Sequence, residues 1–212
     1  MEFEKRFYTF SPTVEKREDG TARLYGYPIV FNSPADIGGM FREIIMPGAL
    51  DGADLKDVPL LVNHNDRMIP VARSRRNNGN STMILMADEK GLRFEATLDI
   101  ARNATAAELY SAVERGDIDG MSFAFRVKKE NERWEGLETD YPTRFINRFT
   151  SIHEISAVTY PAYDASDINA RSKDALDSAR AALDSERQQK ASGTVDTADI
   201  NMARLRAKIK IM

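Results

Sequence analysis

The 212-residue sequence contains no cysteine, and it has only two histidines and one tryptophan. The absence of cysteine excludes disulfide bonds, a thiol nucleophile and thiolate-bound metal, and it is typical of an intracellular protein. The two histidines do not form an H-E-x-x-H pattern or a comparable spacing, and no G-K-[ST] sequence follows the Gly38-Gly39 pair. We therefore expect no metal site, no phosphate-binding loop and no cofactor.

The sequence also lacks long hydrophobic runs and a strong excess of charge. The charged N-terminus, M-E-F-E-K-R-F, is not followed by an apolar segment long enough for a signal peptide or a membrane span. The formal net charge of −3 is close to balance, so it does not indicate a nucleic-acid partner. We expect a soluble cytoplasmic protein that needs neither membrane nor nucleic acid. With 42% hydrophobic residues, it can form the core of one domain with an appendage.

Apolar and alternating segments predict a chain made mostly of strands. The expected strands are residues 3–14, 21–31, 41–46, 58–62, 82–87, 92–98, 120–127 and 152–160. The clearest helix is 105–115, which begins with a capping-box pattern at Thr105 and ends at Gly116. We also expect a short helix at 49–56 and an exposed loop or lid at 130–150.

The composition of the chain changes near Arg171. Residues 172–190 are rich in Ala, Ser, Asp, Arg and Gln, as in a solvated helix, and K-A-S-G-T follows as a linker. The last segment carries an apolar stripe on one helical face, made of Met202, Leu205, Ile209 and Met212. We divide the chain into a domain at 1–170 and a helical, partly flexible tail at 171–212. A stripe this narrow suits docking on a partner or packing back on its own domain.

The candidate site is centred on residues 120–127, G-M-S-F-A-F-R-V, whose alternation predicts a strand with one apolar face. The other face carries Ser122 and is expected to leave room for another chain or a substrate. A serine becomes a nucleophile only beside a base, and a third group must orient that base. His64 could be the base, and either Glu154 or His153 could orient it. Neighbouring strand residues point to opposite faces, so only one of the last two is expected to serve.

Each of these side chains could instead have an ordinary structural role. Ser122 could be a small polar residue within a strand, and His64 could bond backbone groups in an N-H-N-D turn. Glu154 could be the buried ion-pair partner of an arginine, and His153 could be a hydrogen-bonded core histidine. Chain order and spacing alone do not decide between these roles, because catalytic triads occur in many orders.

Five segments, in order along the chain, together resemble the tailed-bacteriophage prohead (capsid maturation) serine protease family, whose fold is similar to that of herpesvirus assemblin. They are G-Y-P-I-V-F-N from Gly26, F-R-E-I-I-M-P-G-A-L from Phe41, L-L-V-N-H-N-D from Leu60, G-M-S-F-A-F from Gly120 and H-E-I-S-A-V-T-Y-P-A-Y from His153. They cover roughly residues 5–170. The resemblance implies a mostly β domain with flanking helices (α+β), built as an assemblin-like closed β-barrel with a helical C-terminal tail.

The resemblance also implies an activity and a site. It implies a serine endopeptidase that cleaves the scaffolding segment of the major capsid protein, and itself, inside the immature capsid (prohead) in the host cytoplasm. Ser122 is then the nucleophile, His64 the base and Glu154 the third member. In assemblin-like enzymes the third member is a second histidine, so His153 remains the alternative. The oxyanion donors are expected among backbone amides of the loop after Tyr160.

Partners follow from the same resemblance. The major capsid protein and its scaffolding segment are the expected partners, and a homo-oligomer is possible. The tail at 171–212 could hold the enzyme to the scaffold and be removed by self-cleavage. The alternative function is a non-catalytic capsid assembly or scaffolding protein on the same fold. Such a protein would have no need of both Ser122 and His64.

Overall fold

The computed structural model describes residues 3–8, 11–159, 172–185 and 188. Residues 172–185 are helical. The other elements of the described chain are β1 (Glu4–Tyr8), β2 (Thr13–Lys16), β3 (Ala22–Val30), β4 (Ala35–Ile37), β5 (Phe41–Ile45), β6 (Asp57–Val62), β7 (Ala72–Arg75), β8 (Met83–Ala87), β9 (Gly91–Leu98), α1 (Ala104–Arg115), β10 (Gly120–Val127), the 3-10 turn η1 (Lys129–Asn131), β11 (Glu132–Glu135), β12 (Thr143–Ile146) and β13 (Phe149–Val158).

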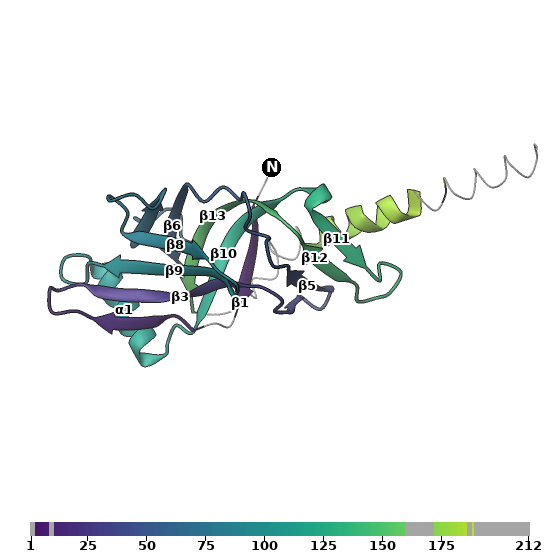
Figure 1. Cartoon of the computed structure of the whole chain (residues 1–212). Helices are drawn as coiled ribbons and strands as arrows, with labels where there is room; N and C mark the ends of the chain where they lie inside the picture. Colours follow the sequence, from purple (N-terminus) through teal and green to yellow (C-terminus); the bar gives the residue numbers. More distant parts are fainter. Residues whose placement is uncertain (1–2, 9–10, 160–171, 186–187, 189–212) are drawn as a thin grey trace, which may run out of the picture.

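The strands pair as three sheets (Figure 1). The central sheet has the order β1-β10-β13-β6-β7, with β6 parallel to β13 and the other pairs antiparallel. One four-stranded sheet has the order β2-β3-β9-β8 and lies on the left of Figure 1, and the other, β11-β12-β5-β4, lies on the right. The mostly β, α+β class predicted from the sequence is therefore confirmed, while the closed barrel stays a prediction.

The apolar face predicted for β10 is confirmed. Met121, Phe123 and Phe125 are fully buried in the main core, and the ring of Phe125 meets that of Phe149 edge to face at 5.0 Å between centroids. Aromatic pairs in this arrangement add about 0.5–1.5 kcal/mol beyond the burial of their area. The opposite face of β10, which we expected to be open, is covered as well at Ser122 and Ala124, because both side chains are buried.

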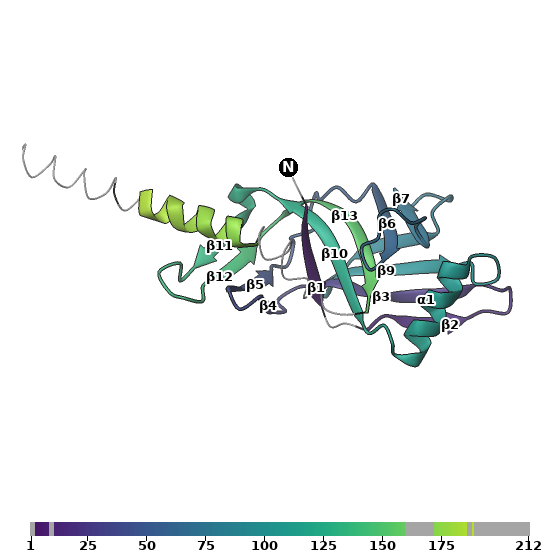
Figure 2. The ribbon, with the colours of Figure 1, turned by 180° about the vertical axis from the view of Figure 1, so that it is seen from behind.

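The helix predicted at 105–115 is confirmed as α1, which lies against β2 in Figure 2. Its N-cap differs from the prediction. The side chain of Asn103 accepts a hydrogen bond from the backbone N–H of Ala106 at 3.2 Å, so Asn103 is the N-cap and the capping box from Thr105 is wrong. Gly116 ends the helix in the left-handed conformation, as predicted (φ 77°).

Two predictions for the N-terminal third are wrong. The expected strand 3–14 is two strands, β1 and β2, which join different sheets. The expected helix at 49–56 is irregular and begins with turns, and Gly52 within it has a left-handed backbone (φ 73°). A left-handed residue cannot continue a right-handed helix, which explains why the segment stays irregular.

The exposed loop or lid expected at 130–150 is also wrong. This segment forms β11 and β12, and β12 pairs in parallel with β5. Trp134 packs edge to face on Phe41, and Arg144 is almost completely buried. The composition alone predicts a solvated segment, but the charge of Arg144 is neutralised in the interior by Glu4 and Glu43, which are distant in the sequence.

The predicted helix after Arg171 is confirmed over residues 172–185, and it is only partly solvated. Leu176 is buried with Ile37 and Phe41 of the sheet β11-β12-β5-β4, and Arg180 donates a hydrogen bond to the carbonyl of Thr139 at 3.0 Å. The linker from Lys190, the apolar stripe of the last segment and the loop after Tyr160 lie outside the described residues.

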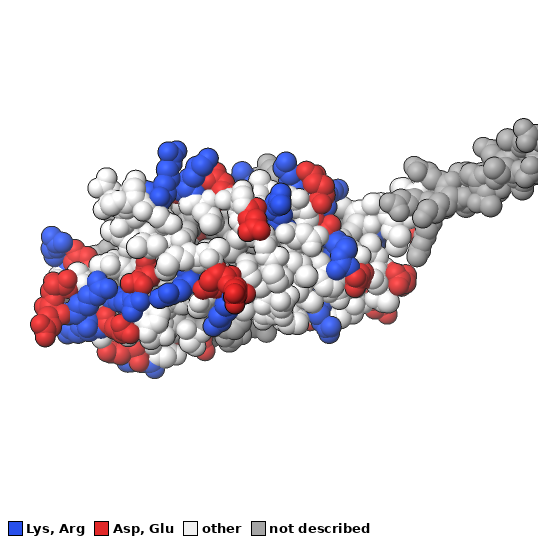
Figure 3. Space-filling view, in the orientation of Figure 1, with Lys and Arg blue, Asp and Glu red and all other residues white. Residues whose placement is uncertain are grey.

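Acidic and basic side chains are interspersed on the face of the molecule shown in Figure 3. Within the described part of the chain, no helix combines the length and the apolar character that crossing a membrane requires.

Candidate active site

His64 is positioned by a tight turn at the end of β6. Asn63 and His64 both have left-handed backbones (φ 51° and 56°), a conformation that is uncommon outside glycine. The side chain of Asn63 accepts a hydrogen bond from the backbone N–H of Thr159 at 3.0 Å and so ties the turn to the end of β13. Such backbones cost about 1–3 kcal/mol each and persist only where surrounding contacts hold them. The turn therefore fixes the imidazole beside β13.

The closest contact in the site joins His64 to Glu154 of β13. The Nδ1 of His64 lies 2.5 Å from Oε1 of Glu154, and both side chains are largely buried. The other carboxylate oxygen, Oε2, accepts a hydrogen bond from the hydroxyl of Ser156 at 2.6 Å. The Ser156 hydroxyl oxygen in turn accepts the backbone N–H of His64 at 3.3 Å. An ionised carboxylate on Nδ1 selects the tautomer with its proton on Nδ1, so Nε2 carries the free lone pair.

Ser122 lies on the strand next to Glu154. In the antiparallel pair of β10 and β13, Ser122 is opposite Ser156 and Ala124 is opposite Glu154. Directly opposite residues of such a pair share a face, so Ser122 and Glu154 project from the same side of the sheet. The Ser122 hydroxyl donates a hydrogen bond to the backbone carbonyl of Arg6 at 2.8 Å. The structure thus places Ser122 and Glu154 on one face of the sheet and His64 in contact with Glu154, while the serine hydroxyl is bonded to β1 rather than to the imidazole.

The second nitrogen of His64 has no partner. Its Nε2 is buried and forms no hydrogen bond. A buried polar atom without a partner costs about 1–3 kcal/mol, so it is rarely retained without a reason. In this position it is the atom that would accept a proton from a serine hydroxyl.

His153 occupies a different place from Glu154. The register between β10 and β13 shifts at this point: Glu154 pairs with Ala124 and Ile152 with Phe125, which leaves His153 in a β-bulge. The exposed ring of His153 stacks on Phe3 at 3.8 Å between centroids. Of the two residues considered for the third position, the structure therefore brings Glu154, and not His153, into contact with His64.

His64, His153 and Glu154 border a cleft of about 630 Å³, and Ser122 is not among its lining residues. Residues 3–6 also line this cleft. The remaining lining residues are Asp57, Pro59, Leu61, Asp66, Met68, Pro70, Arg73 and Ala124. The exposed side chain of Met68 adds apolar surface at the cleft. A cleft with mixed apolar and charged walls suits the side chains of an extended peptide.

Two features of the site are not among those predicted from the sequence. The first is Ser156, and its spacing could have revealed it, because residues two apart on a strand share a face with one another. The second is the contact of β1 with Ser122, which joins residues more than 100 positions apart and has no local signal. Within the described residues, no group of three or more His, Asp or Glu side chains is arranged to hold a metal ion.

Comparison with known proteins gives two matches. The family model described as caudovirus prohead serine protease matches residues 11–179. The prohead protease of Enterobacteria phage HK97 is 31% identical over 168 residues, which cover 76% of this chain and 66% of that protein. No solved structure matches the chain.

Proposed function

Because the chain belongs to the caudovirus prohead serine protease family, we propose that it is a serine endopeptidase that cleaves the scaffolding segment of a phage major capsid protein, and itself, during prohead maturation. One observation carries the proposal: the 2.5 Å contact of His64 with Glu154, beside the strand that holds Ser122. The site of action is then the inside of the prohead in the host cytoplasm. The partners are the major capsid protein and its scaffolding segment, and a homo-oligomer is part of the proposal.

In the proposed reaction, the Ser122 oxygen attacks the carbonyl carbon of the scissile bond while Nε2 of His64 takes the hydroxyl proton. Nε2 then gives that proton to the leaving amine, and the acyl group remains on Ser122. A water molecule, activated by the same nitrogen, releases the acyl group and restores the serine. Glu154 holds the imidazole and stabilises its positive charge between these steps, and Ser156 holds Glu154.

Three further points belong to this proposal. Backbone amides of the loop after Tyr160 stabilise the oxyanion. The protease domain spans 1–170 and folds as an assemblin-like closed barrel. The tail at 171–212 targets the enzyme to the scaffold and is removed by self-cleavage. The helix at 172–185 gives that tail a fixed starting point, because its Leu176 is buried against the sheet β11-β12-β5-β4.

A non-catalytic capsid assembly protein remains the second candidate, because one observation favours it. The Ser122 hydroxyl is fully buried and already donates to the Arg6 carbonyl, as a purely structural serine would. The unpartnered Nε2 of His64 argues for the protease, since a scaffold has no use for such an atom.

The test is co-expression of the chain with its capsid precursor, followed by gel electrophoresis and intact mass. Wild type should shorten the precursor and lose C-terminal mass itself, whereas Ser122→Ala should leave both at full length. Ser111→Ala on α1, which does not line the cleft, is the matched control and should process like wild type. Wild-type processing by Ser122→Ala would contradict Ser122 as the nucleophile, and no processing by wild type would favour the assembly protein.

A further inference from the structure

The strand β1 contacts the candidate nucleophile as a bound peptide would. It forms one edge of the central sheet and pairs there with β10, antiparallel, with Arg6 opposite Phe123 and Phe7 opposite Ser122. The Ser122 hydroxyl donates to the Arg6 carbonyl at 2.8 Å. A scissile peptide group must reach this same hydroxyl. The backbone of β1 therefore occupies the space that a substrate carbonyl requires.

Both reactive atoms are withheld from solvent in this arrangement. Ser122 is fully buried, and Nε2 of His64 is buried without a partner. Residues 3–6 are among the lining residues of the adjoining cleft. A peptide bound in the cleft with β1 in place lies beside the site but cannot bring its carbonyl carbon to the serine oxygen.

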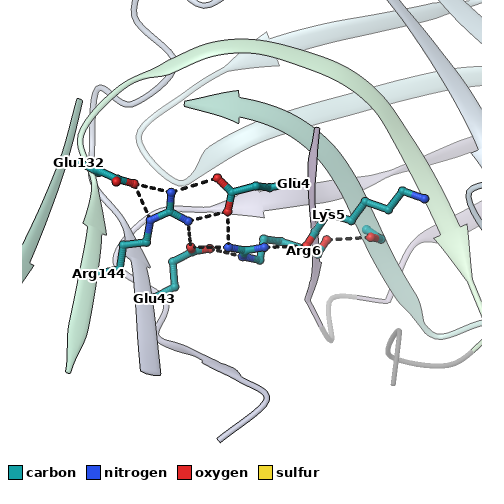
Figure 4. A network of polar contacts seen from close by, with 7 residues as sticks. Glu4, Lys5, Arg6, Glu43, Glu132 and Arg144 are labelled. Atoms are coloured by element: carbon teal, nitrogen blue, oxygen red, sulfur yellow. Dashed lines mark hydrogen bonds and ion pairs between the residues drawn. The ribbon is translucent and has the colours of Figure 1, made fainter. Parts of the chain in front are cut away.

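Besides its backbone pairing with β10, β1 is held by buried ion pairs. Arg6 donates to both carboxylate oxygens of Glu43 at 2.6 and 2.9 Å, and Arg144 donates to both oxygens of Glu4 at 2.6 and 3.0 Å. Arg144 also bonds Glu43 and Glu132, which completes the buried Arg–Glu network of Figure 4. These five residues tie β1 to β5, β11 and β12.

Such a network fixes the position of a strand without a large net stabilisation. The cost of removing charges from water offsets most of their mutual attraction in a protein interior. The remaining contacts include the ring of Phe3, which stacks on His153 and lies under the guanidinium of Arg126 at 3.9 Å from the ring centroid. The family model does not include β1, because the range that it matches begins at residue 11.

We propose that β1 occupies the position on β10 that an extended substrate peptide takes, and that the two exchange before cleavage. The inference rests on the proposed function and deepens it: the substrate binds as an antiparallel strand, and β1 is its internal competitor. Strand addition supplies backbone hydrogen bonds for any extended sequence, while pockets beside the strand select its side chains. The cleft next to His64 is placed to select side chains in this way.

A reversible cross-link tests the exchange in the full chain. Lys5 lies directly opposite Ala124, so Lys5→Cys with Ala124→Cys allows a disulfide between β1 and β10, and the chain has no other cysteine. The probe is diisopropyl fluorophosphate, which bonds its phosphorus to the Ser122 oxygen as fluoride leaves and His64 takes the proton. Locking β1 removes its opening fluctuations, so the oxidised protein should be labelled at least about tenfold more slowly than the same protein after reduction.

The matched control places the disulfide between β2 and β3, with Glu15→Cys and Arg23→Cys, which are directly opposite in that pair. Its labelling rate should be the same when oxidised and reduced. If the β1–β10 variant is labelled at the same rate when oxidised and when reduced, the proposed exchange of β1 is contradicted.

A second measurement uses the wild-type chain. Once Ser122 carries the phosphoryl group, it can no longer donate to Arg6, and β1 must make room. Amide hydrogens of residues 4–8 should then exchange at least about tenfold faster than in the unlabelled protein, while those of β8 stay unchanged. Unchanged exchange in residues 4–8, or no labelling of Ser122 in the wild type, would overturn the proposal.

Failure of the exchange and failure of the proposed function give different results. If Ser122→Ala processes the capsid precursor at the wild-type rate, Ser122 is not the nucleophile. The proposed function then fails, whether or not β1 exchanges with substrate. If Ser122→Ala is inactive but the β1–β10 cross-link leaves the labelling rate unchanged, only the strand exchange is contradicted, and the proposed function stands.

Discussion

The molecule holds two buried groups of polar side chains, which differ in how completely their atoms are hydrogen-bonded. The Arg–Glu network of Glu4, Arg6, Glu43, Glu132 and Arg144 surrounds its buried charges with partners, and none of its buried side-chain atoms is left unbonded. The His64–Glu154 pair bonds both carboxylate oxygens but leaves Nε2 of His64 without a partner. Complete pairing suits a structural role, and a buried imidazole nitrogen without a partner suits a chemical one.

The largest expected effect separates the two residues considered for the third position. In the proposed mechanism Glu154 orients His64 and stabilises its protonated form, so Glu154→Gln should lose this effect; in the worked serine-protease triad an equivalent loss costs about 10⁴ in turnover. His153→Gln is the matched control, because it removes a ring that stacks on Phe3 and does not touch His64. Processing rates of the capsid precursor measure both variants. A greater loss in His153→Gln would transfer the orienting role to His153.

The second expected effect concerns stability at the Arg–Glu network. Glu43 is fully buried and bonds both Arg6 and Arg144, so Glu43→Gln leaves two buried guanidinium groups short of a counter-charge. Breaking such a network by removing one partner costs about 3–5 kcal/mol of unfolding free energy, measurable by urea denaturation. Glu132→Gln is the milder control, because Glu132 bonds Arg144 alone. Equal stability of the wild type and Glu43→Gln would mean that the network does not hold the fold.

The smallest expected effect is a pH dependence of the unfolding free energy that the same network contributes. Burial raises the pKa of Glu4, but the charges of Arg6 and Arg144 and their hydrogen bonds outweigh it and lower the pKa from 4.5 to about 2. Because the folded pKa is the lower one, this stabilisation is complete above about pH 4.5 and is lost as the pH falls toward 2. The loss is on the order of 2–3 kcal/mol by linkage. Urea denaturation at pH 5 and pH 2.5 should show it, and Glu4→Gln should reduce it. An identical pH slope in both proteins would refute the assignment.

The predictable part of the fold follows local patterns. Alternation predicted β10, and an apolar–turn–apolar pattern predicted the β8–β9 hairpin, which is confirmed. The segment 130–150 could not be predicted, because the burial of Arg144 depends on Glu4 and Glu43, which are 140 and 101 positions away. Charged residues appear solvent-exposed in a sequence unless their partners are known.

In the candidate site too, the features that follow local patterns could be predicted, and those that depend on long-range contacts could not. The segments around His64, Ser122 and Glu154 can be identified from the sequence, because each combines a polar side chain with an apolar strand. The difference between Glu154 and His153 could not be derived from alternation, since the β-bulge at His153 breaks the two-residue period at that point. The cover of Ser122 by β1 depends on the same kind of long-range pairing.

The central claim is that Ser122 is a nucleophile activated by the His64–Glu154 pair. Peptide mapping after treatment with diisopropyl fluorophosphate tests it without any substrate. We expect a single phosphoryl adduct on Ser122 in the wild type and no adduct on Ser122 in Glu154→Gln after the same exposure. An adduct on another serine, or equal labelling of Ser122 in both proteins, would contradict the claim.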